Sequence, residues 1–264
     1  MQPAGVEHWL RVAVAGHSQA VIAGDKLVVG RRGIGSAEHH PSRKGRALSC
    51  PVYLRDNEDV TDADAPHPDW DDSYTGPPPP WDIGRPQPAF VRLAEAGTLT
   101  GALLDAGCGT GEQTMLAALH GARAVGIDVS PRAIELARHK AALRGIDASF
   151  QVLDAIHLGT LGETFDTIVD SGLFHVFDDA ARIHYVTALH TALRPGGHLH
   201  LMCFSDDQPG DWGPRRVTEE ELRAAFGSGW QIGSLAPDRF DINPGLGTPT
   251  AEAWLADVVR LASR

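Results

Sequence analysis

A glycine-rich segment with acidic neighbours carries the clearest chemical signal in the chain. The run Gly107-Cys108-Gly109-Thr110-Gly111, the glycine loop, lies between an apolar stretch and a stretch with helical periodicity. Glycines at such a junction let the backbone turn sharply and approach a ligand, and the start of the following helix offers unpaired amides. Asp128 ends the next apolar stretch about 20 residues later, the spacing at which an acidic side chain reaches the ribose of a bound nucleotide. The pattern predicts a nucleoside-binding unit.

The charges around the glycine loop indicate which kind of nucleoside it binds. A dinucleotide site requires G-x-G-x-x-G, whereas this loop reads G-x-G-x-G with Glu112 directly behind it. A carboxylate there would repel a pyrophosphate. Together with Asp105 and Asp128 it favours a nucleoside that bears an ammonium and a sulfonium group. A tight turn that binds no ligand is the alternative interpretation.

A second group of chemically capable residues follows the apolar stretch 165–170. Phe174 and Phe177 are candidates for the wall of an apolar or aromatic pocket, and His175 between them could accept a proton near neutral pH. Ligands bind at the carboxyl ends of parallel strands, where this segment is expected to lie. A histidine that only packs at a loop–helix junction is the alternative for His175.

The remaining histidines and the cysteines do not predict a metal site. His198 and His200 alternate along one apolar stretch, but no carboxylate or cysteine completes a ligand set at a suitable spacing. The cysteines are odd in number and widely spaced without a C-x-x-C pair, which disfavours both a disulfide framework and a cysteine zinc site. We therefore expect no metal, and a structural role for Cys108 as a small residue in the glycine loop.

Alternating strand-like and helical segments must position these residues. The periodicity predicts strands over 102–105, 124–128, 149–153, 165–170, 198–204 and 230–235, and helices over 89–96, 112–120, 131–144 and 179–193, with a turn at 194–197. Ser130 is a predicted N-cap and Gly145 a predicted stop, while Thr218 and Glu221 form a capping box before a short helix. Repeated βα units with nearly continuous apolar strands indicate an α/β fold with a doubly wound, mostly parallel sheet.

The first 75 residues differ from this pattern. Basic residues outnumber acidic ones six to one over 26–46, whereas 56–72 holds eight acidic residues and no basic one. Such segregated charge with little apolar periodicity predicts a poorly ordered or loosely attached N-terminal arm over 1–75 and a folded domain over 76–264.

The overall composition limits the partners. Asp and Glu number 34 against 23 Lys and Arg, for a net charge of −11, which argues against nucleic acid as the main partner. No run approaches the roughly 20 apolar residues that cross a bilayer, and no basic segment of the signal-peptide type precedes the first apolar stretches. These features predict a cytoplasmic protein that does not bind membranes.

Taken together, the motifs resemble those of the class I S-adenosylmethionine-dependent methyltransferases over roughly 81–204. Residues 104–112 are similar to the first motif of that family, 126–130 to the second, 154–155 to its adenine-contacting position, 165–170 to the fourth motif and 193–197 to the turn before its fifth strand. The resemblance implies S-adenosylmethionine as the cofactor. It also implies a seven-stranded Rossmann-like sheet whose last strand is antiparallel. Residues 253–259 could be a helix on composition alone, and the family topology favours this last strand there.

A narrower resemblance comes from Pro80–Pro86, which we call the strap. It is similar to the N-terminal strap of the thiopurine, thiol and halide methyltransferases, which covers the cofactor and helps to wall the acceptor pocket. By this resemblance Trp81 would pack on the cofactor, and Arg85 would lie near its methionine end or near a neighbouring carboxylate. The resemblance as a whole implies a cofactor site formed by Trp81, Arg85, Asp105, Gly107, Cys108, Gly109, Gly111, Asp128, Val129, Asp154, Ala155 and Asp170.

The expected function is methyl transfer from S-adenosylmethionine to an oxygen, nitrogen or sulfur atom of a small, aromatic or heterocyclic acceptor. The acceptor pocket would hold Trp81, Phe174, His175 and Phe177. His175 would act as a general base only where the acceptor must lose a proton. Two alternatives remain: a nicotinamide-dependent oxidoreductase, which the missing third glycine disfavours, and a protein that binds the cofactor without turnover.

Overall fold

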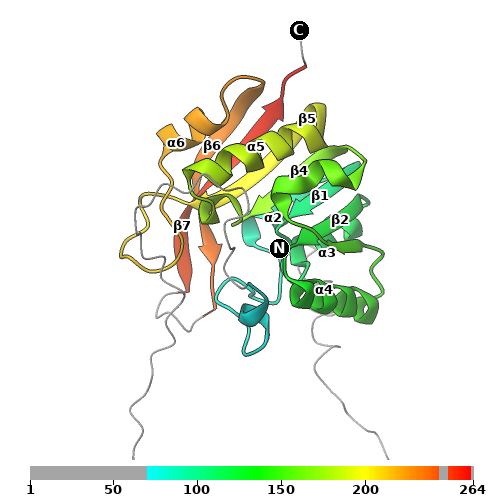
Figure 1. The fold of residues 1–264 in the computed structure, drawn as a ribbon. Coiled ribbons are helices and arrows are strands. Elements are labelled where there is room, and N and C mark those ends of the chain that lie inside the picture. The colour runs from blue at the N-terminus through cyan, green and yellow to red at the C-terminus, as the bar shows by residue number, and fades with distance from the viewer. Residues whose placement is uncertain (1–69, 244–248, 263–264) are drawn as a thin grey trace, which may run out of the picture. The chain divides into compact units, whose positions relative to one another are not determined.

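The central feature of the computed structural model, which describes residues 70–243 and 249–262, is a seven-stranded sheet (Figure 1). Its strands are β1 (Ala102–Ala106), β2 (Arg123–Asp128), β3 (Ser149–Val152), β4 (Phe165–Ser171), β5 (Leu193–Phe204), β6 (Trp230–Asp241) and β7 (Thr250–Arg260). Their spatial order is β3-β2-β1-β4-β5-β7-β6. Strands β1 to β5 pair in parallel, and β7 runs antiparallel to both of its neighbours. The predicted doubly wound sheet with an antiparallel last strand is confirmed.

Helices cover both faces of the sheet. They are α2 (Pro88–Glu95), α3 (Glu112–Leu119), α4 (Pro131–Arg144), α5 (Asp179–Ala192) and α6 (Glu219–Ala225), with 3-10 turns η1 (Trp70–Tyr74), η2 (Ala155–Leu161) and η3 (Phe174–Val176). Figure 1 shows α5 lying along one face. Among these described helices, none has the length and apolarity that crossing a bilayer requires.

The side chains of strand β5 pack into two apolar clusters, one on each face of the sheet. Its residues Leu199, Leu201 and Cys203 pack in one apolar cluster with side chains of α5 and α6. Met202 and Phe204 point the other way and join side chains of α2 and α3. Because successive side chains of a strand alternate between faces, only a nearly continuous apolar run can serve both layers.

The predicted helix ends are confirmed. The Ser130 hydroxyl accepts a hydrogen bond from the Ala133 amide at 3.0 Å at the start of α4. Gly145 ends that helix at φ +64°, and both hydrogen bonds of the Thr218–Glu221 capping box are present at the start of α6. The local sequence therefore specifies both ends of α4 and the start of α6.

Strand ends depart further from prediction. The turn expected at 194–197 lies inside β5, because Leu193 already pairs with Phe165 and a register shift before Thr167 absorbs the extra residues. Strands β6 and β7 pair with each other along almost their whole length and extend beyond 230–235 and 253–259. These ends depend on pairing partners, which a local pattern does not contain.

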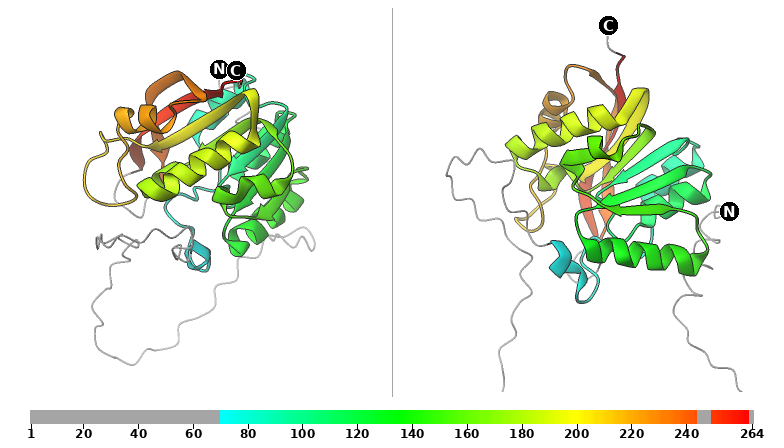
Figure 2. Two further views of the ribbon diagram at one scale, coloured as in Figure 1. Left: turned by 45° about the horizontal axis from the view of Figure 1, so that its top comes forward. Right: turned by 45° about the vertical axis from the view of Figure 1, so that its right-hand side comes forward.

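The described chain begins within the segment that was predicted to be an arm. The Asp71 carboxylate accepts hydrogen bonds from the Ser130 hydroxyl at 2.7 Å and from the Arg132 amide at 2.8 Å. Figure 2 shows η1, in cyan, beside one end of α4. Tyr74 is buried. Residues 70–75 thus contact the sheet domain, and the rest of the predicted arm lies outside the described residues.

The contacts of residues 70–75 predict that two truncations of the N-terminal arm differ in stability. Deleting residues 1–69 is expected to shift the melting temperature by no more than a few degrees, because their sparse apolar content leaves little to bury. Deleting residues 1–75 is expected to cost more, because it also removes Asp71 and the buried Tyr74. Thermal unfolding of the two truncated proteins beside the full chain measures both effects. Equal melting temperatures for the two deletions would contradict this view of residues 70–75.

Candidate active site

The glycine loop joins β1 to α3 in a conformation that only glycine adopts without strain. Gly109 has φ +51° and Gly111, the N-cap of α3, has φ +86°. A Cβ on Gly111 would lie only 2.6 Å from the Phe150 ring. The amide of Gly109 donates to the Asp128 carboxylate at 2.8 Å, so the loop is held against the end of β2. The predicted proximity of loop and acidic residue is present.

Asp128 is organised as an acceptor at the edge of the sheet. Its other oxygen accepts from the Ser130 amide at 2.9 Å, and burial raises the pKa of the carboxyl group. Each carboxylate oxygen has two lone pairs, so both keep capacity for a ligand hydroxyl. Beside it, the apolar Val129 is 40% exposed and Val152, at the end of β3, is 48% exposed. A polar acceptor next to exposed apolar side chains suits the ribose and the base of a nucleoside.

The other residues predicted to contact the cofactor have mainly structural partners. Asp154 is the N-cap of η2 and accepts from the Ile156 amide at 3.1 Å, and Ala155 behind it is buried. The Cys108 thiol is buried, which raises its pKa well above the usual value. Its amide donates to the Ile127 carbonyl oxygen at 2.8 Å. Cys108 therefore packs the glycine loop on β2, as expected for a structural cysteine.

Asp105 adds a buried carboxyl group beneath the loop. It lies in β1 and accepts a hydrogen bond from the Thr114 hydroxyl at 2.6 Å. Burial raises its pKa to about 7, and the nearby Asp170 and Asp128 carboxylates add to the shift. Three acidic side chains at adjoining strand ends favour a cationic ligand, which would relieve their mutual repulsion.

The raised pKa of Asp105 gives a stability prediction. A carboxyl group with a pKa near 4 in the unfolded chain and about 7 in the folded one stabilises the fold fully below pH 4. This contribution is lost as the pH rises to 7. Asp105→Asn stays neutral and can still accept from Thr114, so without cofactor its melting temperature should exceed that of the wild type by a few degrees at pH 8. At pH 5 the difference should be much smaller, and calorimetry at both values tests it. A difference independent of pH would contradict the assignment.

Glu112 requires a correction. It was expected to face a cationic ligand together with Asp105 and Asp128, but it is buried and fully engaged by two cations of α4. Arg144 binds its two carboxylate oxygens at 2.7 and 3.1 Å, and Lys140 binds one of them at 2.9 Å. Its charge is thus neutralised within the protein, and its role is to fix α3 against α4.

The strap lies over the glycine loop. The Thr110 hydroxyl donates to Asp82 at 2.9 Å, and Trp81 donates its indole N–H to the Tyr74 hydroxyl at 3.1 Å. A Cβ on Gly109 would meet that Tyr74 hydroxyl at 3.1 Å. Trp81 itself remains 40% exposed. Tyr74 and Trp81 therefore lie at the glycine loop and the end of β2, where the cofactor is expected.

The strap also reaches the far side of the sheet. Arg85 forms an ion pair with Asp241 at 2.6 Å, which is the neighbouring-carboxylate alternative of the two expected for it. The Asn243 amide group donates to the Pro79 and Asp82 carbonyl oxygens at 2.8 and 2.6 Å. The strap therefore links the glycine loop to the end of β6.

The segment after β4 turns its aromatic residues away from the expected pocket. Phe174 is fully buried, stacks on Phe226 at 5.7 Å between ring centroids and lies 4.4 Å beneath the Arg182 guanidinium. Phe177 packs on Tyr185 at 4.7 Å in the same core. Both belong to the layer under α5 and α6, so the structure does not place them in an acceptor pocket. Phe174 begins the 3-10 turn η3 and Phe177 follows it, and the direction of both side chains depends on tertiary contacts that the local sequence does not contain.

Asp170 is the anchor of this segment. One of its oxygens accepts from the Leu173 amide at 2.7 Å, and the other accepts from the Phe174 amide at 3.0 Å and from the Tyr185 hydroxyl at 2.9 Å. Burial raises its pKa to about 7. With three donors bound, Asp170 shapes the loop after β4 from beneath.

His175 is buried and neutral. Its Nδ1 accepts a hydrogen bond from the Phe204 amide at 2.9 Å, and its ring contacts those of Phe204 and Phe240. Burial, together with Arg182 and Arg216, lowers its pKa to about 3. In this neutral ring Nδ1 is the nitrogen with the free lone pair, and the Phe204 amide already donates to it. This arrangement does not favour a role for His175 as a general base.

Several residues at this edge were not anticipated. Tyr74 and Asp71 lie in the segment that was assigned to the arm, and Asn243 is remote in sequence from the strap that it binds. Lys140, which binds both the Thr110 hydroxyl and Glu112, is on the polar side of a helix whose pattern gives no functional signal. In the sequence of the segment 70–74, the aromatic residues Trp70 and Tyr74 beside two aspartates are the signal that indicates contact with the domain.

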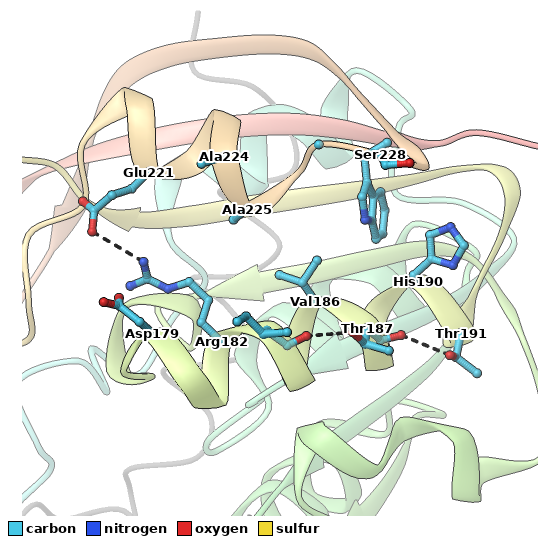
Figure 3. A pocket seen from close by; sticks show the side chains of 13 residues that line it. Asp179, Arg182, Val186, Thr187, His190, Thr191, Glu221, Ala224, Ala225 and Ser228 are labelled. Atoms are coloured by element: carbon cyan, nitrogen blue, oxygen red, sulfur yellow. Dashed lines mark hydrogen bonds and ion pairs between the residues drawn. The ribbon is translucent and has the colours of Figure 1, made fainter. Parts of the chain in front are cut away.

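A separate groove of about 730 Å³ lies between α5 and α6 (Figure 3). Arg182 and Glu221 face one another at one end, at 3.6 Å, and His190 lies at the other. The ring of Trp230, which also lines the groove, contacts that of His190 at 5.3 Å between ring centroids. None of the residues predicted for the cofactor or the acceptor lines it. The groove is therefore distinct from the candidate active site.

Comparisons with known proteins agree with this geometry. Residues 103–197, from β1 to the start of β5, match the methyltransferase domain family. The chain is 37% identical over 168 residues to the 2-heptyl-1-hydroxyquinolin-4(1H)-one methyltransferase of Mycobacteroides abscessus, covering 62% of this chain and 74% of that protein. It is 28% identical over 188 residues to the probable thiol methyltransferase 2 of Arabidopsis thaliana, covering 70% and 83% respectively.

A solved structure extends the likeness to three dimensions. It concerns the conversion of a disulfide bond into a thioacetal group during echinomycin biosynthesis and is 39% identical in sequence, with a TM-score of 0.67 over 73% of this chain and 91% of that one. These matches favour methyl transfer over nicotinamide-dependent redox chemistry and over cofactor binding without turnover. The chain therefore belongs to the class I S-adenosylmethionine-dependent methyltransferases, and it uses S-adenosylmethionine to methylate a small-molecule acceptor.

Proposed function

We propose that the protein methylates an acidic oxygen or sulfur atom, an N-hydroxyl, phenolic hydroxyl or thiol, carried by a small aromatic heterocycle that binds as its own anion. The observation that carries this proposal is the neutral His175, whose Nδ1 lone pair is used by the Phe204 amide. An acceptor that ionises by itself near neutral pH needs no protein base. The names of the two relatives give a hydroxyquinolinone and a thiol as their acceptors, which carry a hydroxyl and a sulfhydryl group respectively.

The cofactor would be held by the residues that the geometry gathers at the edge of β1, β2 and β3. The close backbone of the glycine loop and the exposed Val129 would contact it, while Asp128, which holds the loop through the Gly109 amide, would accept from its ribose hydroxyls. When bound, S-adenosylmethionine would supply a methyl group on a sulfonium: the lone pair of the acceptor would bond to the methyl carbon, and the electron pair of the broken carbon–sulfur bond would stay on sulfur. Burial raises the pKa of Asp105, Asp128 and Asp170, and a bound cation would favour the ionised form of these carboxyl groups.

The protein contributes alignment and exclusion of water. The attacking lone pair must lie opposite the departing sulfur at about 3–3.5 Å from the methyl carbon, which favours a rigid and dry site. The strap supplies a cover that is tied to the glycine loop through Asp82 and to β6 through Asn243. These hydrogen bonds restrict the movement of the strap, and they take no direct part in methyl transfer.

An acceptor screen tests the proposed function. The purified protein would be incubated with S-adenosylmethionine and matched pairs of heterocycles that differ only in carrying a hydroxyl, a thiol or an amine, with products read by a mass increase of one methyl group. We expect methylation of N-hydroxy and thiol heterocycles and little reaction with the amines. Preference for amines, or for macromolecular acceptors, would refute the proposal.

Trp81 provides a further prediction. Trp81→Ala is expected to lower turnover at least tenfold, because it removes an aromatic side chain that binds Tyr74 over the glycine loop and admits water. Trp81→Phe keeps an aromatic face but loses the indole N–H, so its turnover should lie between the two. Initial rates at saturating cofactor measure this series. Unchanged turnover in Trp81→Ala would exclude the strap from the acceptor site.

A further inference from the structure

Gly172, directly after β4, leaves a small space beside the Nε2 edge of the buried His175 ring. A Cβ on Gly172, which has φ +95°, would lie 3.4 Å from His175 Nε2, 3.5 Å from its Cε1 and 3.7 Å from Phe240 Cζ. Because glycine has no side chain, that space remains next to Nε2. Ser171, Gly172 and Leu173 are all partly exposed, so this space is at the rim of the sheet and not in the core.

The same rim borders the glycine loop. Strands β1 and β4 are neighbours, with Ala106 paired to Asp170, so Gly107 and Gly172 leave the sheet side by side. A Cβ on Gly107 would lie 3.0 Å from the Leu173 side chain, which shows how closely the two loops approach. An acceptor that receives a methyl group from a cofactor on the glycine loop must bind at this junction. The Nε2 edge of His175 is therefore near the place where the acceptor is expected.

The hydrogen bond to Nδ1 determines what Nε2 carries. A neutral imidazole has one N–H, and because Nδ1 accepts from the Phe204 amide, the proton is on Nε2. The charged groups that act on the ring are Arg182 from α5 and Arg216 from the segment after β5. The nearest carboxylate along the loop, Asp170, is turned toward Leu173, Phe174 and Tyr185. The ring is thus a neutral donor in surroundings that favour an anion.

We propose that His175 donates a hydrogen bond from Nε2 to the anionic oxygen or sulfur of the acceptor and so aligns the attacking atom. This inference rests on the proposed function and gives His175 the opposite role to that of a base. It binds the deprotonated acceptor selectively and removes no proton. The substrate class that it selects is the conjugate base of a hydroxyl or thiol heterocycle.

Two substitutions test the roles of the two ring nitrogens of His175 separately. His175→Asn places an amide oxygen near the position of Nδ1 and retains an acceptor for the Phe204 amide, but it has no donor at the position of Nε2. His175→Gln reaches the position of Nε2 with an amide N–H. With an N-hydroxy heterocycle that the wild type methylates, we expect kcat/KM to fall ten- to hundredfold in His175→Asn and to recover substantially in His175→Gln.

The pH profile of kcat distinguishes this role from packing. The rising limb of kcat reports ionisation of the bound acceptor, and loss of a donor to the anion should move its midpoint upward by about one pH unit in His175→Asn. A packing residue would lower kcat at every pH without moving the limb. An unmoved limb, or equal losses in the Asn and Gln variants, would overturn the proposal.

A measurement on the wild-type protein covers the case in which the variants do not fold. The acceptor would be titrated by its ultraviolet absorbance in complex with the protein and S-adenosylhomocysteine. We expect its bound pKa to lie below its pKa in water, because Nε2–H stabilises the anion. A bound pKa equal to or above the free value would overturn the inference even where methylation is observed. Absence of methylation of every hydroxyl and thiol heterocycle by the wild type would instead refute the proposed function.

Discussion

Replacing Asp128 by alanine should weaken the binding of S-adenosylmethionine at least tenfold. The substitution removes the acceptor for two ribose hydroxyls, and a hydrogen bond to a charged group contributes about 1.5–3 kcal/mol. It also frees the Gly109 and Ser130 amides, which Asp128 holds at 2.8 and 2.9 Å, so the glycine loop loses one of its hydrogen bonds to β2 and keeps the one from the Cys108 amide to the Ile127 carbonyl oxygen. Isothermal titration of the cofactor measures the affinity directly.

Asp128→Asn is the matched control for this experiment. Its amide oxygen can accept from one backbone amide, whereas its NH2 group has no such partner, so an intermediate affinity is expected. Far-ultraviolet circular dichroism should show the same helix content for the three proteins. Wild-type affinity in Asp128→Ala would remove Asp128 from the cofactor site and leave the exposed Val129 and Val152 without a nucleoside to contact.

Gly111→Ala should have the largest effect on stability. Alanine at φ +86° costs about 1–2 kcal/mol, and its Cβ would lie 2.6 Å from the Phe150 ring and 3.0 Å from Ala137, which adds about 1–3 kcal/mol of overpacking. For a domain of this size the melting temperature should fall by about 5–15 °C. Gly145→Ala isolates the backbone cost, because Gly145 has φ +64° and no atom within 4 Å of its Cβ position.

The difference between these two glycine variants is the decisive quantity. Gly145→Ala should lower the melting temperature by only a few degrees, since it carries the backbone cost alone. Differential scanning calorimetry on the two proteins gives the comparison. A fall in Gly111→Ala no larger than that in Gly145→Ala would show that Phe150 moves aside without cost and that the loop tolerates a side chain there.

The elements of this fold could be predicted where the signal is local. Ser130, Pro131 and Gly145 specify α4 from end to end, because caps act within one helical turn. The end of β6 at Asp241 and the start of β5 at Leu193 could not be predicted, because each depends on a strand that lies far away in sequence. Pairing partners decide strand ends, and a single stretch of sequence does not contain them.

The same distinction applies to the candidate site. The glycine loop and Asp128 were predictable, since both belong to one βαβ unit with a fixed spacing. Glu112 was placed correctly along the chain, but its pairing with Lys140 and Arg144 of α4 is a tertiary contact. The environment of His175 was equally inaccessible, because Phe204, Phe240 and Arg216 approach it from β5, β6 and the segment beyond β5.

The ties of the strap have a consequence for the order in which the protein assembles. Asn243 binds Pro79 and Asp82 across sequence separations of 164 and 161 residues, and Gln87 binds Asp241 across 154. Contacts between such distant residues pay a large loop-closure entropy and form late. During synthesis the strap, the glycine loop and β2 emerge from the ribosome long before β6, so the strap can contact the glycine loop through Asp82 before its partners at the end of β6 exist. The strap therefore gains its full set of contacts only when the last strands have been made.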